Sequence, residues 1–395
     1  MVSSVAVACV PLASVLITAR VTQGVGAAII APATLALITE FSPEGPERLK
    51  ATSAYGAVAG IGVAVGMVLG GIFTEVWSWR VGFIINVPMG LLLLYLVHRT
   101  LPSRSVRTGS LDVLGALSST VGIAAVLYAI VLSADSGWSN PMVIVSLALG
   151  IALFAWFIYH ESRAQHPLLP LHLFNNTQRN AILASRFLLV GSVMSFFFFA
   201  TQVLQDSLGY NALQAGFSFV PLSLVQFATA KLSPKFAARG VSEAFLVVGG
   251  LLMMVGGMAF LAFAPLWGLW AGLVLVGAGQ GFAFGTMTSA AIQHAHSKDA
   301  GAVSGLVNSV HQIGGTFGVG VFSALAVTII GQSEGANMVI ERAHFGFTLS
   351  MVCLLAAAAL ACTMFMHASN LGNFSEQQRP SSGRHQQILQ EEQTT

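Results

Sequence analysis

The sequence predicts an all-α membrane protein, and three observations support this class. Hydrophobic residues make up 55% of the chain and charged residues only 8%, whereas an ordinary globular domain carries about 25% charged residues. Eleven stretches approach or exceed the length of about 20 apolar residues that a helix needs to cross a bilayer. The alternation of apolar and polar residues that a membrane barrel requires is not evident in the sequence.

The predicted membrane helices follow one another from residue 12 to residue 368. Residues 1–10 are apolar and have the character of the end of a further helix. A break is expected at Pro265, because residues 244–292 carry no charge and are too long for one crossing. After residue 368 the chain becomes polar, which predicts a disordered tail over residues 369–395. The predicted helices cover residues 12–39, 51–74, 81–97, 113–134, 141–160, 180–204, 212–230, 244–264, 266–292, 300–330 and 345–368.

Lysine and arginine are unequally distributed between the predicted loops, and this predicts the orientation of the chain. One set of alternate loops holds thirteen of these residues, whereas the other set holds only Arg80 and Arg342. Because lysine and arginine accumulate in cytoplasmic loops, we expect the richer set and the C-terminal tail in the cytoplasm of a multi-pass cell-membrane protein. The richer set is Arg48, Lys50, Arg99, Arg104, Arg107, Arg163, Arg179, Lys231, Lys235, Arg239, Lys298, Arg379 and Arg384.

The sequence disfavours several other classes of function. The net charge is only +2 and the basic residues are spread over many short loops, so nucleic acid is not an expected partner. The glycine-rich run 277–285 lies in a predicted membrane helix with no strand before it, which disfavours a phosphate-binding loop. The histidines of the run 160–166 are six residues apart, rather than the four that place zinc ligands on one helix face. No nucleophile constellation is visible in the sequence, so we expect no enzymatic activity, no cofactor and no metal.

Glycines recur at a four-residue spacing in two of the predicted helices. Small residues at this spacing allow two helices to approach closely, and the order of the motifs resembles two parallel repeats. Chance matching in a chain with 41 glycines is the alternative. The residues are Gly62, Gly66, Gly70 and Gly71 in the second helix and Gly314 and Gly318 in the tenth, each set preceded by a helix with a Gln-Gly pair, Gln23-Gly24 or Gln280-Gly281.

Six stretches carry motifs that can be compared with a known family. They are Arg20-x-x-Gln23-Gly24-x-Gly26-Ala27, Gly62-x-x-x-Gly66-Met67-x-x-Gly70-Gly71, WSWRVGFIINVPMG (77–90), HPLLPLHLF (166–174), LQDSLGYNALQAGFSFVP (204–221) and AGAVSGLVNSVHQIGGTFG (300–318). The first resembles the fourth-helix motif of the major facilitator superfamily, and the second resembles the fifth-helix motif associated with its antiporters. The other four resemble the fourteen-helix drug:proton antiporter branch. The resemblance covers essentially residues 1–370.

The resemblance implies a helical bundle of the facilitator type, with about eleven transmembrane helices and a partial one. Residues 1–98 would form an incomplete N-terminal bundle, residues 99–179 two inserted helices with their flanking loops, and residues 180–368 a six-helix C-terminal bundle. Met67 stands where the family usually has proline. The family pattern also has two and a half earlier helices with a basic loop motif and an acidic residue, which correspond to roughly 70 residues. We therefore expect the 395-residue chain alone not to carry out proton-driven export.

Arg20 is the only Asp, Glu, Lys or Arg between Met1 and Thr39. A charge at membrane depth costs at least about 2.5–3.5 kcal/mol on insertion scales, so it is expected to face a cavity or a partner. The alternative is that the Arg20 side chain extends to the membrane surface. Arg20 lies roughly 12 Å along its predicted helix, which is far for such an extension. The resemblance implies that Arg20 takes part in proton coupling in a central cavity, with Gln23, Gly24 and Gly26 beside it.

Other polar residues within the predicted helices are further candidates for transport. For Arg186, a coupling role and extension to the cytoplasmic surface are both open, because it lies only six residues inside its predicted helix. His311 stands where the family often carries arginine and can change its charge near neutral pH, although buried histidines are often simply hydrogen-bonded. Five further side chains either orient a substrate or bond neighbouring helices: Gln202, Gln226, Gln280, Asn308 and Gln312.

These features together predict a multidrug efflux transporter, which exports amphipathic organic compounds in exchange for protons. Its expected partners are a small amphipathic substrate, protons and the lipid bilayer, and we expect a monomer. Two alternatives stay open: a truncated, non-transporting remnant or helix-bundle scaffold, and an uptake carrier of the same fold. On the transporter hypothesis Arg20→Ala abolishes export, and Arg186→Ala has a milder effect.

Overall fold

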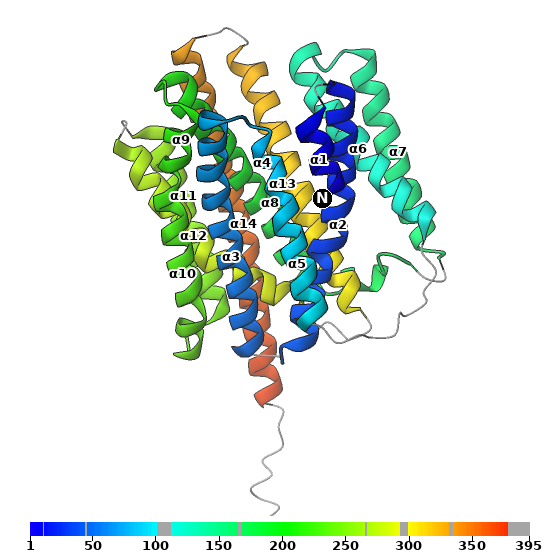
Figure 1. The fold of residues 1–395 in the computed structure, drawn as a ribbon. Coiled ribbons are helices and arrows are strands. Elements are labelled where there is room, and N and C mark those ends of the chain that lie inside the picture. Colours follow the sequence, from blue (N-terminus) through cyan, green and yellow to red (C-terminus); the bar gives the residue numbers. More distant parts are fainter. Residues whose placement is uncertain are drawn as a thin grey trace, which may run out of the picture.

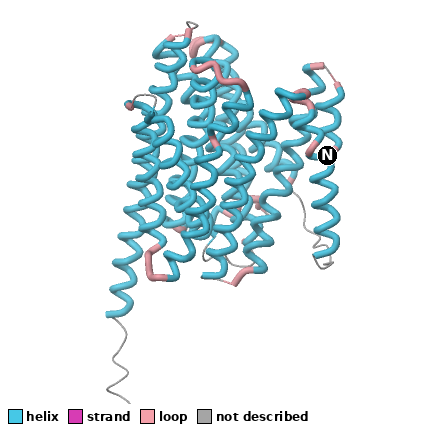
Figure 2. The backbone as a smooth tube through the Cα atoms, turned by 60° about the vertical axis from the view of Figure 1, so that its left-hand side comes forward, coloured by secondary structure: helices cyan, strands magenta, loops and turns pink. Residues whose placement is uncertain are grey.

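The computed structural model is a bundle of long helices joined by short loops (Figures 1 and 2). It describes residues 1–10, 12–43, 46–100, 112–164, 167–264, 267–292, 299–331 and 335–377. Within these ranges every regular element is a helix, and no strand occurs. The predicted all-α class is therefore confirmed.

The helices follow the predicted order, but some of their ends differ. The last helix continues to Gln377, so residues 369–377 of the predicted tail are helical, and residues 378–395 lie outside the described part of the chain. The expected break near Pro265 is present, between Phe263 and Trp267. The helices are α1 (Val2–Cys9), α2 (Ala13–Phe41), α3 (Pro46–Val76), α4 (Val81–Ile84), α5 (Asn86–Thr100), α6 (Val113–Ser136), α7 (Pro141–Glu161), η1 (Leu171–Asn175), α8 (Thr177–Gln202), the π-helix η2 (Val203–Ser207), α9 (Ala212–Ser218), α10 (Val220–Ala238), α11 (Glu243–Phe263), α12 (Trp267–Ile292), α13 (Ala300–Ile330) and α14 (Ala336–Gln377).

Ten segments of the described residues are long and apolar enough to cross a membrane. A further long helix, α3, has 31 residues and contains the predicted helix 51–74. Its apolar stretch Val65–Val76 is counted separately from the ten. The predicted partial helix corresponds to α1, which has 8 residues.

Two of the predicted membrane helices are interrupted, and proline explains both interruptions. Proline has no backbone N–H, so it cannot bond the carbonyl four residues earlier. Pro88 thus leaves the carbonyl of Ile84 without its helical partner, and α4 ends at that residue. Pro221 likewise leaves the carbonyl of Phe217 without its helical partner, and α9 ends at Ser218, the residue after Phe217.

The C-terminal half of the chain is closely packed. α8 packs against α13 and α14, α11 packs against α12 and α14, and α10 packs against α12. A continuous apolar core fills the space between these helices and includes Phe196, Phe219, Leu251 and Met254, which are almost fully buried. α3 joins this half through α9, α10 and α12, α2 joins it through α13, and α6 and α7 pack on each other beside α13.

The described basic loops of the richer set lie at one end of the bundle. In Figure 1 the C-terminal ends of α2, α5, α10 and α14 and the N-terminal end of α3 point downward. Arg48 and Lys50 at the start of α3, Arg99 in the last turn of α5 and Lys235 in the last turn of α10 therefore share this end. Arg80, which precedes α4, lies at the opposite end. The helices thus alternate in direction as the charge pattern predicts.

Candidate functional site

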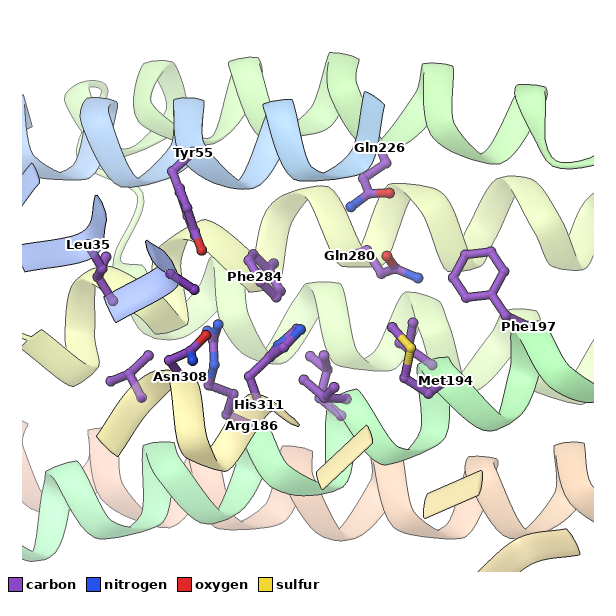
Figure 3. Close-up of a pocket in the computed structure, with 15 residues that line it drawn as sticks. Leu35, Tyr55, Arg186, Met194, Phe197, Gln226, Gln280, Phe284, Asn308 and His311 are labelled. Carbon is purple, nitrogen blue, oxygen red and sulfur yellow. The ribbon is translucent and has the colours of Figure 1, made fainter. Parts of the chain in front are cut away.

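A cavity of about 140 Å³ lies where α2 and α3 meet α8, α10, α12 and α13 (Figure 3). Both halves of the chain contribute to its wall. Because a water molecule needs at least about 10–15 Å³, the cavity has room for several waters or for one small organic group. It is lined by Ala31, Leu35, Tyr55, Arg186, Leu189, Val190, Val193, Met194, Phe197, Gln226, Gln280, Phe284, Val307, Asn308 and His311.

Three polar residues of the wall lie at a similar depth in the membrane helices. Tyr55 and Arg186 each lie nine residues after the first residue of α3 and α8, and Asn308 lies eight residues after the first residue of α13. At 1.5 Å per residue these positions are about 12–14 Å along their helices. The site is therefore inside the membrane-spanning part of the bundle rather than in its loops.

Arg186 is the charged residue of the cavity, and its side chain is only 3% exposed. Its Nη1 donates a hydrogen bond to the hydroxyl oxygen of Thr288 at 2.7 Å. Its guanidinium carbon lies 4.4 Å from the centre of the Phe284 ring, and cations are attracted to the face of such a ring. Of the two readings left open by the sequence, the structure shows burial in the cavity, not extension to the membrane surface.

Three buried nitrogen atoms of the lining have no hydrogen-bond partner among the described residues. They are Nε of Arg186, Nδ1 of His311 and Nε2 of Gln280. The ring of His311 lies edge-on to Phe284, with the ring centres 5.6 Å apart. No Asp or Glu belongs to the lining, and no salt bridge of Arg186 occurs in the part of the chain that the structure describes. Because buried polar groups are nearly always satisfied in proteins, these atoms mark a place where a ligand or water can bind.

Five of the residues that the sequence singled out meet in this cavity. They are Arg186, Gln226, Gln280, Asn308 and His311, which come from α8, α10, α12 and α13. Gln202 and Gln312 do not line it: the former is half-buried near the end of α8, and the latter is exposed.

Arg20 lies outside this cavity, and its side chain is exposed. It donates a hydrogen bond to Gln23 at 3.2 Å and lies 5.6 Å from the ring centre of Phe83, while Gln23 donates to the hydroxyl of Ser4 at 2.7 Å. Ala31 of α2 does line the cavity, and Arg20 is on nearly the same face of the helix, since eleven residues make about three turns. The separation has a simple cause, because eleven residues also correspond to about 16 Å along the helix.

The glycines of the two motifs differ in their surroundings. A methyl group added at Gly71 would lie 2.8 Å from the carbonyl oxygen of Ala212, and one added at Gly314 would lie 2.8 Å from the carbonyl oxygen of Phe187. Gly318 similarly faces the backbone of Gly191. These three glycines stand at close contacts of α3 with α9 and of α13 with α8. Nothing lies within 4 Å of the corresponding position at Gly24, Gly26, Gly62, Gly66 and Gly70.

Sequence reasoning missed three residues of the site: Tyr55, Phe284 and Thr288. Figure 3 shows Tyr55 extending from α3 toward the Arg186, Asn308 and His311 group. Tyr55 lies in the second predicted helix, and Phe284 and Thr288 lie four residues apart in the ninth, one turn from each other. Only the packing of α12 on α8 could show that this turn holds the guanidinium.

Comparison with known proteins identifies a family and several relatives that the chain resembles. Residues 1–319 match the family described as the Major Facilitator Superfamily. The puromycin resistance protein pur8 of Streptomyces alboniger is 35% identical over 374 residues, which cover 88% of this chain and 72% of that protein. The cephamycin export protein CmcT of Amycolatopsis lactamdurans is 33% identical over 356 residues, which cover 87% of this chain and 72% of that protein.

A third relative is matched over a smaller part of its length. The uncharacterized MFS-type transporter EfpA of Mycobacterium tuberculosis is 33% identical over 317 residues, which cover 78% of this chain. The chain spans only about 59% of the length of that relative. Taken with the helical bundle and the cavity between its halves, these matches show that the chain belongs to the Major Facilitator Superfamily.

Proposed function

We propose that the protein exports amphipathic organic compounds across the cell membrane in exchange for protons, with its C-terminus in the cytoplasm. The observation that carries the proposal is the cavity at membrane depth between the halves of the chain. Transporters of this kind work by moving one helical bundle against the other around a site near the middle of the membrane. A cavity walled by both halves changes its exposure when the halves move.

The lining of the cavity suits an amphipathic compound. Most of its side chains are apolar, and a few polar groups converge in it, which is typical of small-molecule sites. His311 provides a group of the type that exchanges protons near neutral pH. We assign coupling roles to His311 and Arg186, and we keep Arg20 with Gln23, Gly24 and Gly26 as a second polar region along the same path. The name of the CmcT relative, a cephamycin export protein, supports export as the direction.

The basic end of the bundle supports the orientation. Arg48, Lys50, Arg99 and Lys235 lie at the same end as the C-terminal end of α14. Positively charged residues flanking membrane helices are retained on the cytoplasmic side. We therefore place this end, and the tail that follows α14, in the cytoplasm.

An efflux assay tests the proposal. The protein is produced, with any further residues that its reading frame encodes, in a bacterium that lacks its own drug pumps, and the cells are loaded with either ethidium or carboxyfluorescein. We expect at least one dye to leave faster than from empty-vector cells, and we expect a protonophore to abolish the difference. Empty-vector rates for both dyes at normal expression would favour the non-transporting scaffold, and faster accumulation would favour an uptake carrier.

A second arm uses residues 1–395 alone. From the sequence we expect no protonophore-sensitive efflux from residues 1–395. Efflux well above the empty-vector rate would contradict that expectation and would show that these residues suffice for export.

A further inference from the structure

Positive and negative side chains occupy different depths of the membrane helices. Every described Asp and Glu lies either outside a helix or within six residues of a helix end. Arg186, in contrast, lies nine residues inside α8 and is 3% exposed. The described chain therefore places a buried cation, and no carboxylate, at the depth of the cavity.

The guanidinium of Arg186 is held on two sides, and one of its nitrogen atoms has no hydrogen-bond partner among the described residues. Thr288 accepts from Nη1 at 2.7 Å, and the Phe284 ring covers one face at 4.4 Å. Nε is buried and has no partner among the described residues. Gln280 and His311 can each be turned or protonated to present a donor or an acceptor, but arginine is always charged and can only donate. Arg186 therefore decides the sign of the group that the cavity accepts.

We propose that the cavity binds the carboxylate, or a similar oxyanion, of a small amphipathic anion. This inference rests on the proposed function, in that it takes the ligand to be the transported compound, and it names the charge of that compound. An oxyanion accepts the charge-assisted hydrogen bond that Nε of Arg186 is placed to donate. Nε2 of Gln280, the second unpartnered donor of the wall, is available to the same ligand.

The lining holds the guanidinium toward one end and a mixture of amide and apolar groups toward the other. In Figure 3 the side chains of Tyr55, Arg186, Asn308 and His311 gather toward one end, whereas Gln226, Gln280, Met194 and Phe197 lie toward the other. At about 140 Å³, the cavity is close to the roughly 150 Å³ that accommodates benzene in a protein interior. An organic cation of this size would meet Arg186 without any carboxylate in the lining to offset the repulsion.

Binding to the purified protein in detergent tests the proposal without requiring transport. The probes are benzoate, benzamide and benzylammonium, which share a ring and differ in charge, and their affinities are measured at neutral pH by ligand-observed NMR and thermal unfolding. We expect benzoate to bind at least about tenfold more tightly than the other two, as a charge-assisted hydrogen bond implies. Failure of benzoate to bind, or equal or tighter binding of benzylammonium, would overturn the proposal.

Variants locate the preference in the cavity. Arg186→Gln is expected to remove the preference for benzoate over benzamide, whereas Arg186→Lys keeps part of it because the charge is kept. Lys231→Gln is the matched control: it removes one positive charge from an exposed position of α10 and should leave the preference unchanged. A folded Arg186→Gln variant that still prefers benzoate would also contradict the proposal. If that variant does not fold, the comparison of the three probes on the unaltered protein decides alone.

Chloride and inorganic phosphate separate an amphipathic anion from a free inorganic one. We expect neither to displace benzoate at equal concentration, and displacement at equal concentration would show a simple ion site instead. The proposed function and the proposed anion preference can fail independently. If the unaltered protein binds benzoate but exports no dye, the proposed function is contradicted. If it exports dye but does not prefer benzoate, only the inference about charge is contradicted.

Discussion

At the scale of single residues, Arg186 shows how a charge is accommodated inside a membrane bundle without a carboxylate in its cavity. Its guanidinium has one hydroxyl acceptor, Thr288, and one aromatic face, Phe284. Thr288 is held in turn, because its hydroxyl donates to the carbonyl of Phe284 at 2.8 Å. One turn of α12 therefore both orients and stabilises the guanidinium.

Replacing Thr288 tests this support. Thr288→Val keeps the shape of the side chain but removes the acceptor, so a buried charged donor loses its partner, at a cost of about 1.5–3 kcal/mol. We expect a lower midpoint of thermal unfolding for the purified protein. Thr288→Ser keeps the hydroxyl and serves as the control. Equal midpoints for the two variants would show that the hydrogen bond does not stabilise the fold.

The placement of the two arginines reverses the order of effects that the sequence favoured. Arg186 lines the cavity, and Arg20 is exposed beside Gln23 and Phe83. We now expect Arg186→Ala to reduce dye efflux to the empty-vector rate and Arg20→Ala to retain a larger part of it. Efflux rates at matched expression measure the order, and a greater loss for Arg20→Ala would return the central role to that residue.

At the scale of helices, close contact depends on which glycine faces a neighbour. Gly70 and Gly71 are adjacent in α3, but only Gly71 faces the backbone of α9. Gly71→Ala must push the two helices apart, and overpacking of this kind costs about 1–3 kcal/mol. Gly70→Ala meets open space and gains up to about 1 kcal/mol of helix propensity. Thermal unfolding should therefore show a lower midpoint for the first variant only, and equal midpoints would contradict the packing role of Gly71.

The two inserted helices are joined at their ends by a contact between a carboxylate and a histidine. Asp112 precedes α6, and each of its carboxylate oxygens lies 3.0 Å from Nε2 of His160 in the last turn of α7. The backbone N–H of Gly115 and the side chain of His160 hold the pKa of Asp112 below its ordinary value of 3.8. A lowered folded-state pKa means that this stabilisation is present above that value and is lost as the pH falls through the folded-state pKa.

Asp112→Asn tests the contribution of the Asp112 charge, because asparagine also caps a helix but carries no charge. We expect the variant to unfold at a lower temperature than the unaltered protein at neutral pH. The difference should shrink in acid, below the ordinary pKa of the carboxyl group. A difference that is the same at both pH values would assign the effect to shape rather than to charge.

At the scale of the whole molecule, the testable quantity is orientation. In a background without Cys9, Cys353 and Cys362, single cysteines are introduced at positions 104 and 341 and treated with an impermeant thiol reagent from outside the cell. Arg104 lies outside the described residues, and Glu341 is exposed near the start of α14. We expect labelling at position 341 and protection at position 104. The opposite pattern would invert the proposed topology.

Much of the fold could be predicted, because a membrane helix is specified locally. Apolar length alone located the segments from α2 to α14, and the excess length between residues 244 and 292 predicted the break before α12. The interruptions before Pro88 and Pro221 were missed. A proline alone does not mark such a break, since Pro32 and Pro234 lie inside the continuous helices α2 and α10. The extension of α14 to Gln377 was missed for another reason, because polar residues do not prevent a helix from continuing beyond its membrane span.

By itself the sequence determined the class of the protein, the order of its helices and the alternation of its basic loops, because hydrophobicity and charge act on each segment separately. Only the tertiary structure decided which polar residues share a cavity. Arg20 and Arg186 are both arginines within apolar helices, yet one is exposed and the other is buried against α12. The difference arises from the helices that pack around each residue, and no property of either segment alone contains that information.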